Sequence, residues 1–202
     1  MKLYFSPGAC SLSPHIVLLE AGVDFETEQV DLKSKRSADG TDFRGINPKG
    51  YVPALQLDSG AVLTEGPAIV QYLADLAPER NLAPMSGTLA RYKLAEWLNF
   101  ISTELHKSFG AFFNPASSAE AKEQARAHLA RRFDYVNDVL AGHDYLLGAQ
   151  FSVADAYLFT ILNWPPKVGI DLSPWPALQA FHTRVGARPA VQRAMRDEGL
   201  IS

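Results

Sequence analysis

The chain has 202 residues, 47% of them hydrophobic and 20% charged, which fits one ordinary domain or two small ones. Its 19 Lys and Arg residues against 22 Asp and Glu residues give a formal net charge of -3, which argues against nucleic-acid binding through a basic surface. The single cysteine excludes an internal disulfide and a four-thiolate zinc site, and favours a reducing compartment. Because the N-terminus lacks a signal-like apolar run and no apolar stretch approaches the roughly 20 residues of a membrane helix, we expect a cytoplasmic protein without a membrane partner.

The sequence pattern changes character along the chain. Strand and helix signals alternate up to residue 77, whereas the pattern beyond residue 88 is almost only helical. Between them lies a segment with two prolines, a glycine and no apolar periodicity. We therefore predict a first domain over residues 1–77, a linker over 78–87 and an all-helical domain over 88–202.

The first domain is predicted to contain four strands and two helices. The first helix carries apolar residues from Leu12 at helical spacing and ends near Gly22, and the second begins near Pro67 and stops before Pro78. The polar stretch 33–45 is expected to be a loop with one short helix. The order β-α-β, then β-β-α, matches a thioredoxin-like sheet covered by helices. The strands are expected at Leu3–Phe5, Phe25–Leu32, Tyr51–Asp58 and Ala61–Thr64.

The second domain is predicted to be a helical bundle, so the fold class is α/β followed by all-α. Two long helices are expected over Leu89–Phe113 and Ala119–Leu140. A further helix opens at Ser152, where Asp155 completes a capping box, and the run that begins with Trp164 and two prolines should end it early.

Cys10 is the sharpest chemical feature of the sequence. It follows a strand and precedes a helix, where unpaired amides and the helix dipole favour a thiolate. The Cys-x-x-Ser pattern ends at Ser13, which cannot resolve a disulfide, so monothiol chemistry or polar help to a bound thiol remains. An inert buried thiol explains the position equally well.

Two turns in the first domain carry further candidate residues. Val52 precedes Pro53 at a strand start, where a cis peptide would turn the Val52 backbone toward an extended ligand, although base rates alone favour trans. Glu65 and Gly66 stand at a helix N-terminus, which suits an anion and an α-amino group. A glutamate whose negative charge only stabilises the helix dipole at this N-terminus explains the same pattern.

A polar series runs along the first long helix of the second domain. Asn99, Thr103, His106 and Lys107 follow one another at spacings of three and four residues, which predicts that they share one face of the helix; that face could line a cleft or be solvated. The other histidines show no metal-ligand spacing, so we expect no metal site.

Taken together, these residues resemble the cytosolic glutathione transferases, and most closely their bacterial beta class. Cys10 and the His106-Lys107 pair point to that class. The likeness runs nearly from end to end and rests on several motifs in order. They are Ser6–Ser13, Asn47–Pro53, Leu63–Ile69, Trp97–Phe100, Glu104–Lys107 and Ser152–Phe159.

The resemblance implies a homodimer that binds glutathione as a co-substrate, with no other cofactor, and a small hydrophobic electrophile. Cys10, Ser11 and His106 would act on the glutathione sulfur, and Lys107 and Trp164 would line the electrophile pocket. The remaining glutathione-binding positions would be Lys35, Val52, cis-Pro53, Glu65, Gly66, Asn99 and Thr103, together with His106 and Lys107; Asn99 would reach the neighbouring subunit's glutathione.

The leading hypothesis is conjugation of the glutathione thiolate to an electrophilic carbon. A thiol of pKa about 8.5 is only about 3% ionised at pH 7, so lowering its pKa is the main task. Two alternatives remain: thioltransferase or peroxidase chemistry through a Cys10 mixed disulfide, and a non-catalytic binding module with the same fold.

Overall fold

The computed structural model describes residues 1–202 and divides them into two compact units. Unit 1 contains Met1–Ala83 together with Ala187–Ser202, and unit 2 contains Pro84–Gly186. The expected boundary after the first domain is close to the observed one, but the expected extent of the second domain, 88–202, is wrong at its C-terminal end.

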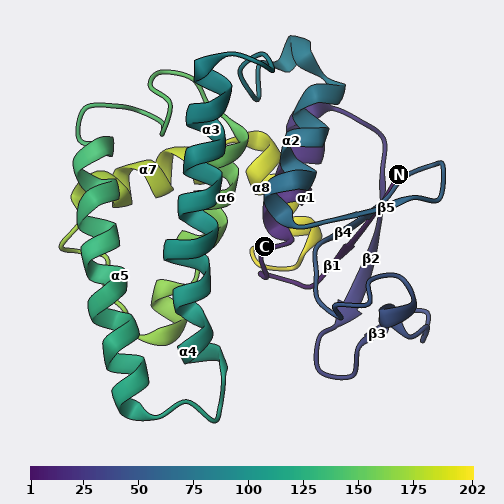
Figure 1. Ribbon diagram of the computed structural model, residues 1–202, viewed down its shortest axis with the longest axis horizontal. Helices are drawn as coiled ribbons and strands as arrows, with labels where there is room; N and C mark the ends of the chain where they lie inside the picture. Colours follow the sequence, from purple (N-terminus) through teal and green to yellow (C-terminus); the bar gives the residue numbers. More distant parts are fainter. The chain divides into compact units, whose positions relative to one another are not determined.

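The C-terminal segment belongs to unit 1 because its helix packs on the first helix of that unit. Helix α8 (Pro189–Asp197) lies against α1 (Leu12–Ala21), and its Val191 and Ala194 are fully buried (Figure 1). An apolar stripe of this kind is stable only where another element covers it, and α1 provides that cover.

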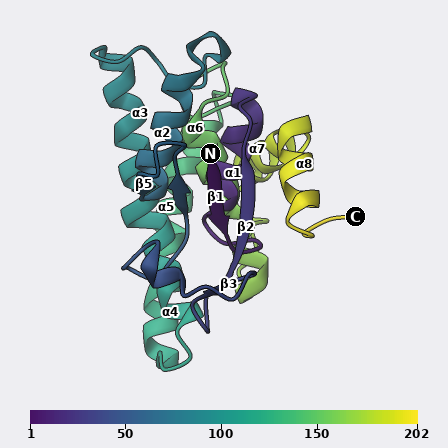
Figure 2. The same cartoon turned by 90° about the vertical axis from the view of Figure 1, so that its right-hand side faces the viewer.

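Unit 1 is built on one five-stranded sheet in the order β3-β2-β1-β4-β5. Strand β1 runs parallel to β2 and antiparallel to β4, and the outer pairs β2–β3 and β4–β5 are antiparallel. This mixed sheet with its β-α-β start is the predicted thioredoxin-like arrangement, and Figure 2 shows β1 and β2 side by side. The strands are β1 (Lys2–Phe5), β2 (Glu26–Asp31), β3 (Arg36–Ser37), β4 (Ala54–Gln56) and β5 (Val62–Thr64).

Most helix ends predicted for unit 1 from turn and capping residues are confirmed. Helix α1 ends at Gly22, which adopts φ of 70°, a left-handed conformation that glycine reaches without steric cost. Helix α2 (Gly66–Leu76) carries a proline in its first turn, as expected. The predicted short helix is the 3-10 turn Phe43–Gly45, whereas β3 was not predicted because two residues in a polar stretch show no alternation.

Unit 2 is entirely helical. The stretch 89–113 is helical as predicted, but it is not one uniform helix: between α3 and α4 lie a π-helical segment, Ile101–Leu105, and a 3-10 segment, His106–Phe109. The α-helices are α3 (Leu89–Phe100), α4 (Gly110–Phe113), α5 (Ala119–Leu140), α6 (Val153–Leu162) and α7 (Pro176–Gly186).

Helix α6 is the buried centre of unit 2, since all ten of its residues are buried. At its start the Asp155 carboxylate accepts hydrogen bonds from the Ser152 N–H and hydroxyl, both at 2.8 Å, and from the Leu146 N–H at 2.8 Å. Burial nevertheless raises the pKa of Asp155 to about 6. The helix ends at Leu162, and the 3-10 turn Pro165–Val168 follows, so the prolines stop the helix as expected.

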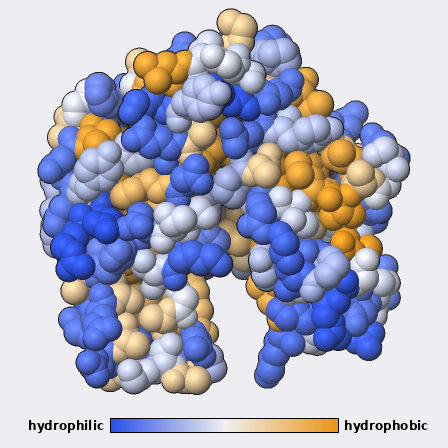
Figure 3. All heavy atoms as spheres, in the orientation of Figure 1, coloured by the Kyte–Doolittle hydropathy of each residue, from blue (hydrophilic) through white to orange (hydrophobic).

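The surface carries scattered apolar side chains. On the face drawn in Figure 3, hydrophobic side chains gather over β4 and β5. None of the helices is both long and apolar enough to cross a membrane.

Candidate functional site

Cys10 lies in the loop between β1 and α1, directly before the helix. Its side chain is partly buried, and its thiol donates to the Val52 carbonyl oxygen, with 3.3 Å between Sγ and oxygen. The first helical turn begins with tight turns, in which Leu12 donates to the Ala9 carbonyl and Ser13 donates to the Cys10 carbonyl. The fold thus places the thiol at a helix start, where partial positive charge favours a nearby thiolate.

The hydroxyl of Ser11 braces this loop. Ser11 is fully buried, and its Oγ accepts from the Ser6 N–H at 3.1 Å and donates to the Ser6 carbonyl at 3.3 Å. Ser13 is equally buried, but its Oγ has no hydrogen-bond partner. The structure therefore places the Ser11 side chain inside the loop that carries Cys10, where it holds backbone rather than faces outward.

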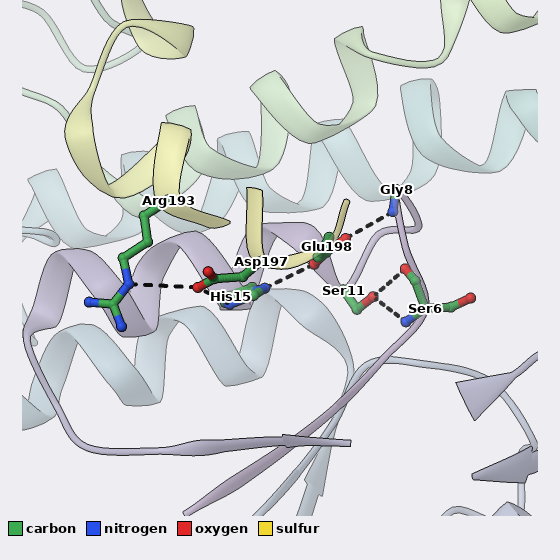
Figure 4. Close-up of polar contacts among 7 residues, drawn as sticks. All are labelled: Ser6, Gly8, Ser11, His15, Arg193, Asp197 and Glu198. Atoms are coloured by element: carbon green, nitrogen blue, oxygen red, sulfur yellow. Dashed lines mark hydrogen bonds and ion pairs between the residues drawn. The ribbon is translucent and has the colours of Figure 1, made fainter. Parts of the chain in front are cut away.

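The loop is also tied to the C-terminal segment of unit 1 (Figure 4). Gly8 has a φ of 68°, and its N–H donates to Glu198 Oε2 at 2.8 Å. The other oxygen of Glu198 lies 3.0 Å from Nδ1 of His15, on the buried face of α1. Both side chains are almost fully buried, and Asp197 lies 3.9 Å from the second nitrogen of the same imidazole. Glu198 thus holds the loop before Cys10 and the helix after it with one carboxylate.

The peptide bond between Val52 and Pro53 is cis, as the resemblance implies. Both residues are buried. The start of α2 adjoins this turn, because a Cβ built on Gly66 would stand 3.9 Å from Pro53 Cγ, an ordinary contact distance. Cys10, the Val52–Pro53 turn and the N-terminus of α2 therefore come together within unit 1.

Glu65 occupies the N-cap position of α2 with a φ of 72°. Its carboxylate is exposed and pairs with the ammonium group of Lys49, which also donates to Thr64 Oγ1 at 3.1 Å. The hydrogen bond from Lys49 to Glu65 raises the pKa of the lysine. A non-glycine residue with positive φ is uncommon and is concentrated at functional sites, which fits a ligand contact by Glu65.

Lys35 also has a positive φ, 60°, and its side chain is partly exposed. Its carbonyl accepts from the Phe43 N–H at 2.9 Å, which fixes the turn that carries it. The aliphatic stem passes Gly50, where a Cβ would lie 3.7 Å from Lys35 Cδ. The structure therefore brings Lys35 to the same turn region as Lys49.

In unit 2 the predicted polar series is divided rather than continuous. Asn99, Thr103 and Lys107 are exposed, and Thr103 Oγ1 donates to the Asn99 carbonyl at 3.0 Å. The predicted common face assumes a uniform α-helix, but the π-helical segment changes the winding before His106. Such single-turn π segments are frequent at functional sites.

His106 stands apart from the exposed residues because its ring packs inward. Nδ1 of His106 lies 2.6 Å from the Tyr157 hydroxyl, and the Trp164 ring meets the imidazole edge-on at 4.9 Å between centroids. Trp164 is only 5% exposed and also packs on Phe109 and Phe113. The predicted pocket residue Trp164 thus belongs, within unit 2, to an aromatic cluster around His106.

The π-helical segment is held from the side by α5. Arg132 donates to the Glu104 carboxylate at 2.7 Å, and His128 Nε2 lies 3.2 Å from the Glu104 carbonyl oxygen. The Ser108 hydroxyl donates to the same carbonyl at 2.8 Å. The Glu104 carbonyl thus has two side-chain partners, and Arg132 ties the Glu104 side chain to α5.

Three residues with a direct bearing on these positions were not predicted. Lys49 pairs with Glu65, Tyr157 pairs with His106, and Glu198 pairs with the Gly8 N–H. Lys49 stands within a turn that was singled out, so its proximity to the site was a usable signal. No spacing rule relates the other two to their partners, because Tyr157 lies in a helix that is buried on all sides and Glu198 lies at the far end of the chain.

Comparison with known proteins agrees with this geometry. Residues 8–76 match the family model of the glutathione S-transferase N-terminal domain, and residues 100–189 match that of the C-terminal domain. The chain is 48% identical over 200 residues to glutathione S-transferase GstA of Escherichia coli O157:H7, covering 99% of this chain and 100% of that protein.

Solved structures show the same likeness. The bacterial glutathione transferase BphK, solved as a ternary complex, has 62% identity and a TM-score of 0.98, with 98% of this chain and 100% of that chain covered. The beta-class glutathione S-transferase of Sphingomonas chungbukensis has 48% identity and a TM-score of 0.97, with both chains fully covered at 100%.

Proposed function

Since the chain belongs to the glutathione S-transferase family and groups with its bacterial beta class, we propose that it conjugates reduced glutathione to small hydrophobic electrophiles. The observation that carries the proposal is the convergence, within unit 1, of the Cys10 thiol, the Val52 carbonyl and the N-terminus of α2. These groups come from three separate segments, and a purely structural role for each does not require them to meet.

We assign the glutathione contacts of unit 1 by the chemistry of each group. The Val52 backbone pairs with the cysteinyl backbone of glutathione, beside cis-Pro53. Glu65 and the Gly66 amide hold the γ-glutamyl end, because that end carries both an ammonium and a carboxylate group. Lys35 pairs with the glycyl carboxylate. Glutathione is a co-substrate, and the reaction needs no further cofactor.

Cys10 and Ser11 serve the sulfur of glutathione in different ways. Cys10 lies at the start of α1, where the helix dipole and a polar thiol stabilise negative charge on a bound sulfur. The Ser11 hydroxyl is committed to Ser6, so its contribution is to hold the loop in place. Ser11 is therefore a positioning residue in this proposal.

The residues of unit 2 complete the proposed assignment. His106 donates a hydrogen bond to the glutathione sulfur, and Lys107 supplies positive charge on the thiol and electrophile side. Thr103 contributes a further glutathione contact. Asn99 reaches the glutathione of a second subunit in a homodimer. Exposed apolar side chains of unit 2 support such a dimer, among them Met85, Leu89 and Tyr92, which are 77%, 76% and 68% exposed.

The reaction is nucleophilic attack by the glutathione thiolate on an electrophilic carbon. The sulfur–carbon bond forms as the leaving group departs with its electron pair, or as the pair moves onto the acceptor in an addition. Lowering the thiol pKa by about two units, roughly 2.7 kcal/mol, raises the thiolate fraction at pH 7 from about 3% to about three-quarters. Trp164 lines the electrophile pocket as part of its aromatic cluster with His106 and Phe109.

The test is the initial rate of conjugation of glutathione to 1-chloro-2,4-dinitrobenzene, measured for the wild type and for Cys10→Ala over a range of pH. We expect saturable activity whose apparent pKa lies below that of free glutathione, and reduced but measurable activity for the variant. Absence of activity in both proteins, with glutathione still bound, would contradict the proposal. A pH profile that follows free glutathione would contradict the mechanism.

A further inference from the structure

The His106 side chain is held by aromatic groups from another part of unit 2. Its Nδ1 lies 2.6 Å from the hydroxyl of Tyr157, which is 3% exposed and stands in the middle of α6. The two rings are nearly perpendicular, with an interplanar angle of 83°, and the Trp164 ring crosses the imidazole at 72°. The imidazole therefore has a defined orientation, in which one of its two nitrogens is assigned to Tyr157.

The two groups can form this hydrogen bond in either direction, and its length favours donation by Tyr157. A neutral imidazole has one N–H donor and one bare nitrogen acceptor, whereas a phenol both donates and accepts. The separation of 2.6 Å is shorter than the usual 2.9 to 3.0 Å of an N–H donor, and is typical of O–H donors, at about 2.5 to 3.0 Å. Donation by Tyr157 leaves Nδ1 as the acceptor and puts the imidazole proton on Nε2.

Helix α6, which carries Tyr157, is buried along its whole length and held at its start. Every residue of α6 is buried, and the hydrogen bonds of Asp155 fix the start of the helix two residues before Tyr157. On the other side, His106 begins the 3-10 segment that follows the π-helical turn. A side chain held between two fixed backbones loses little further entropy when it binds a ligand.

We propose that Tyr157 is a positioning residue for catalysis: its hydroxyl donates to Nδ1 of His106, holds the imidazole as the Nε2–H tautomer, and so supplies a ready N–H donor for the glutathione sulfur. This inference rests on the proposed function. In solution a histidine exchanges freely between tautomers and ring orientations, and only some of these present an N–H to the sulfur. The Tyr157 hydrogen bond selects among them before the substrate arrives.

The first measurement is the tautomer of His106 by long-range proton–nitrogen NMR of the full-length protein with labelled histidine, at a pH where the ring is neutral. His106→Asn identifies the signal by its loss. We expect a bare Nδ1 and a protonated Nε2 in the wild type, and a mixture of tautomers in Tyr157→Phe. A wild-type His106 that carries its proton on Nδ1 would overturn the inference, whether or not the variant folds.

The second measurement is a double-mutant cycle on the conjugation rate. We expect Tyr157→Phe to lower kcat about 5- to 10-fold, the size of one lost hydrogen bond, with the KM for glutathione changed by less than about twofold. Tyr145→Phe is the matched control, since it removes a hydroxyl of unit 2 that makes no hydrogen bond, and it should leave kcat unchanged. In the His106→Asn background, Tyr157→Phe should have no further effect.

The outcomes separate this inference from the proposed function. If His106→Asn lowers kcat but Tyr157→Phe changes neither kcat nor the tautomer, the inference fails while the proposed function stands. If the two substitutions lower kcat independently, Tyr157 does not act through His106 and the inference fails. If the tautomer changes as expected while His106→Asn keeps full activity, the assigned role of His106 is wrong.

Discussion

Replacing Glu198 tests whether the C-terminal segment holds the loop that carries Cys10. The carboxylate accepts from Gly8 at 2.8 Å and meets Nδ1 of His15 at 3.0 Å, and its side chain has no solvent exposure. Glu198→Ala removes the carboxylate that Gly8 and His15 share, and leaves the buried His15 without its partner. Breaking a buried pair in this way costs about 3 to 5 kcal/mol. Glu198→Gln preserves the shape and one acceptor, so its cost should be about 1 to 3 kcal/mol.

The assay is urea unfolding followed by circular dichroism and by tryptophan fluorescence. All three tryptophans, Trp97, Trp164 and Trp175, lie in unit 2, whereas the ellipticity reports the helices of both units. If the substitution destabilises unit 1 alone, the ellipticity transition will shift to a lower urea concentration than the fluorescence transition. If the two units unfold cooperatively, both transitions will shift together.

The matched control is Asp197→Asn. Asp197 is the neighbour of Glu198, but its side chain is 46% exposed and lies 3.9 Å from the histidine nitrogen. Because the Asp197 carboxylate is half-exposed and lies beyond hydrogen-bond distance of His15, it contributes little, and the unfolding free energy should change by less than about 0.5 kcal/mol. A Glu198→Ala variant that unfolds within about 1 kcal/mol of the wild type would show that the reasoning is wrong.

Two further predictions concern buried polar groups. Ser11→Ala should lower the unfolding free energy by about 1 to 3 kcal/mol because it strips two hydrogen bonds from Ser6, whereas Ser13→Ala, which removes an unpartnered hydroxyl, should be neutral or stabilising; the reverse order in urea unfolding would contradict this. The pKa of Asp155 is raised from 3.8 to about 6, so the folded protein binds this proton more tightly, and the resulting stabilisation, roughly 3 kcal/mol, is present below about pH 4 and is lost as the pH rises to about 6. Asp155→Asn cannot ionise and should lack this component when unfolding is measured from pH 4 to pH 7; an unchanged pH dependence would refute it.

The sequence predicts those features that depend on neighbouring residues. Gly22 ends its helix because a left-handed residue is needed there, and Pro67 opens another because it needs no N–H in the first turn. The capping residue Asp155 and the prolines after Trp164 act within a few positions in the same way. Each of these signals has its physical cause within one turn of chain, so the pattern alone is sufficient.

Contacts between distant segments were not predictable on the same basis. Gly8 and Glu198 are separated by 190 residues, and no spacing rule relates a loop glycine to a carboxylate near the chain end. The C-terminal helix therefore appeared to continue the helical domain, since periodicity reports that a face is buried but not which partner buries it.

The π-helical segment was missed for a different reason. The apolar residues Leu98, Ile101, Leu105 and Phe109 follow each other at spacings that a regular helix also accepts. The wider turn is stabilised instead by contacts from α5 to Glu104, which lie outside the segment itself. Winding of this kind is a tertiary property and leaves no mark in the local pattern.

The predicted site residues and the partners found only in the structure have complementary roles. A group that serves a substrate must stay partly accessible, so its orientation depends on neighbouring side chains. Glu65 obtains it from Lys49, and His106 obtains it from Tyr157. The residue type that performs the chemistry is visible in a sequence, because the reaction dictates it. The partner is chosen by geometry, and many residue types could fill that position. This asymmetry explains why the resemblance implies which residues contact glutathione, whereas the side chains that pair with Glu65 and His106 are found only in the structure.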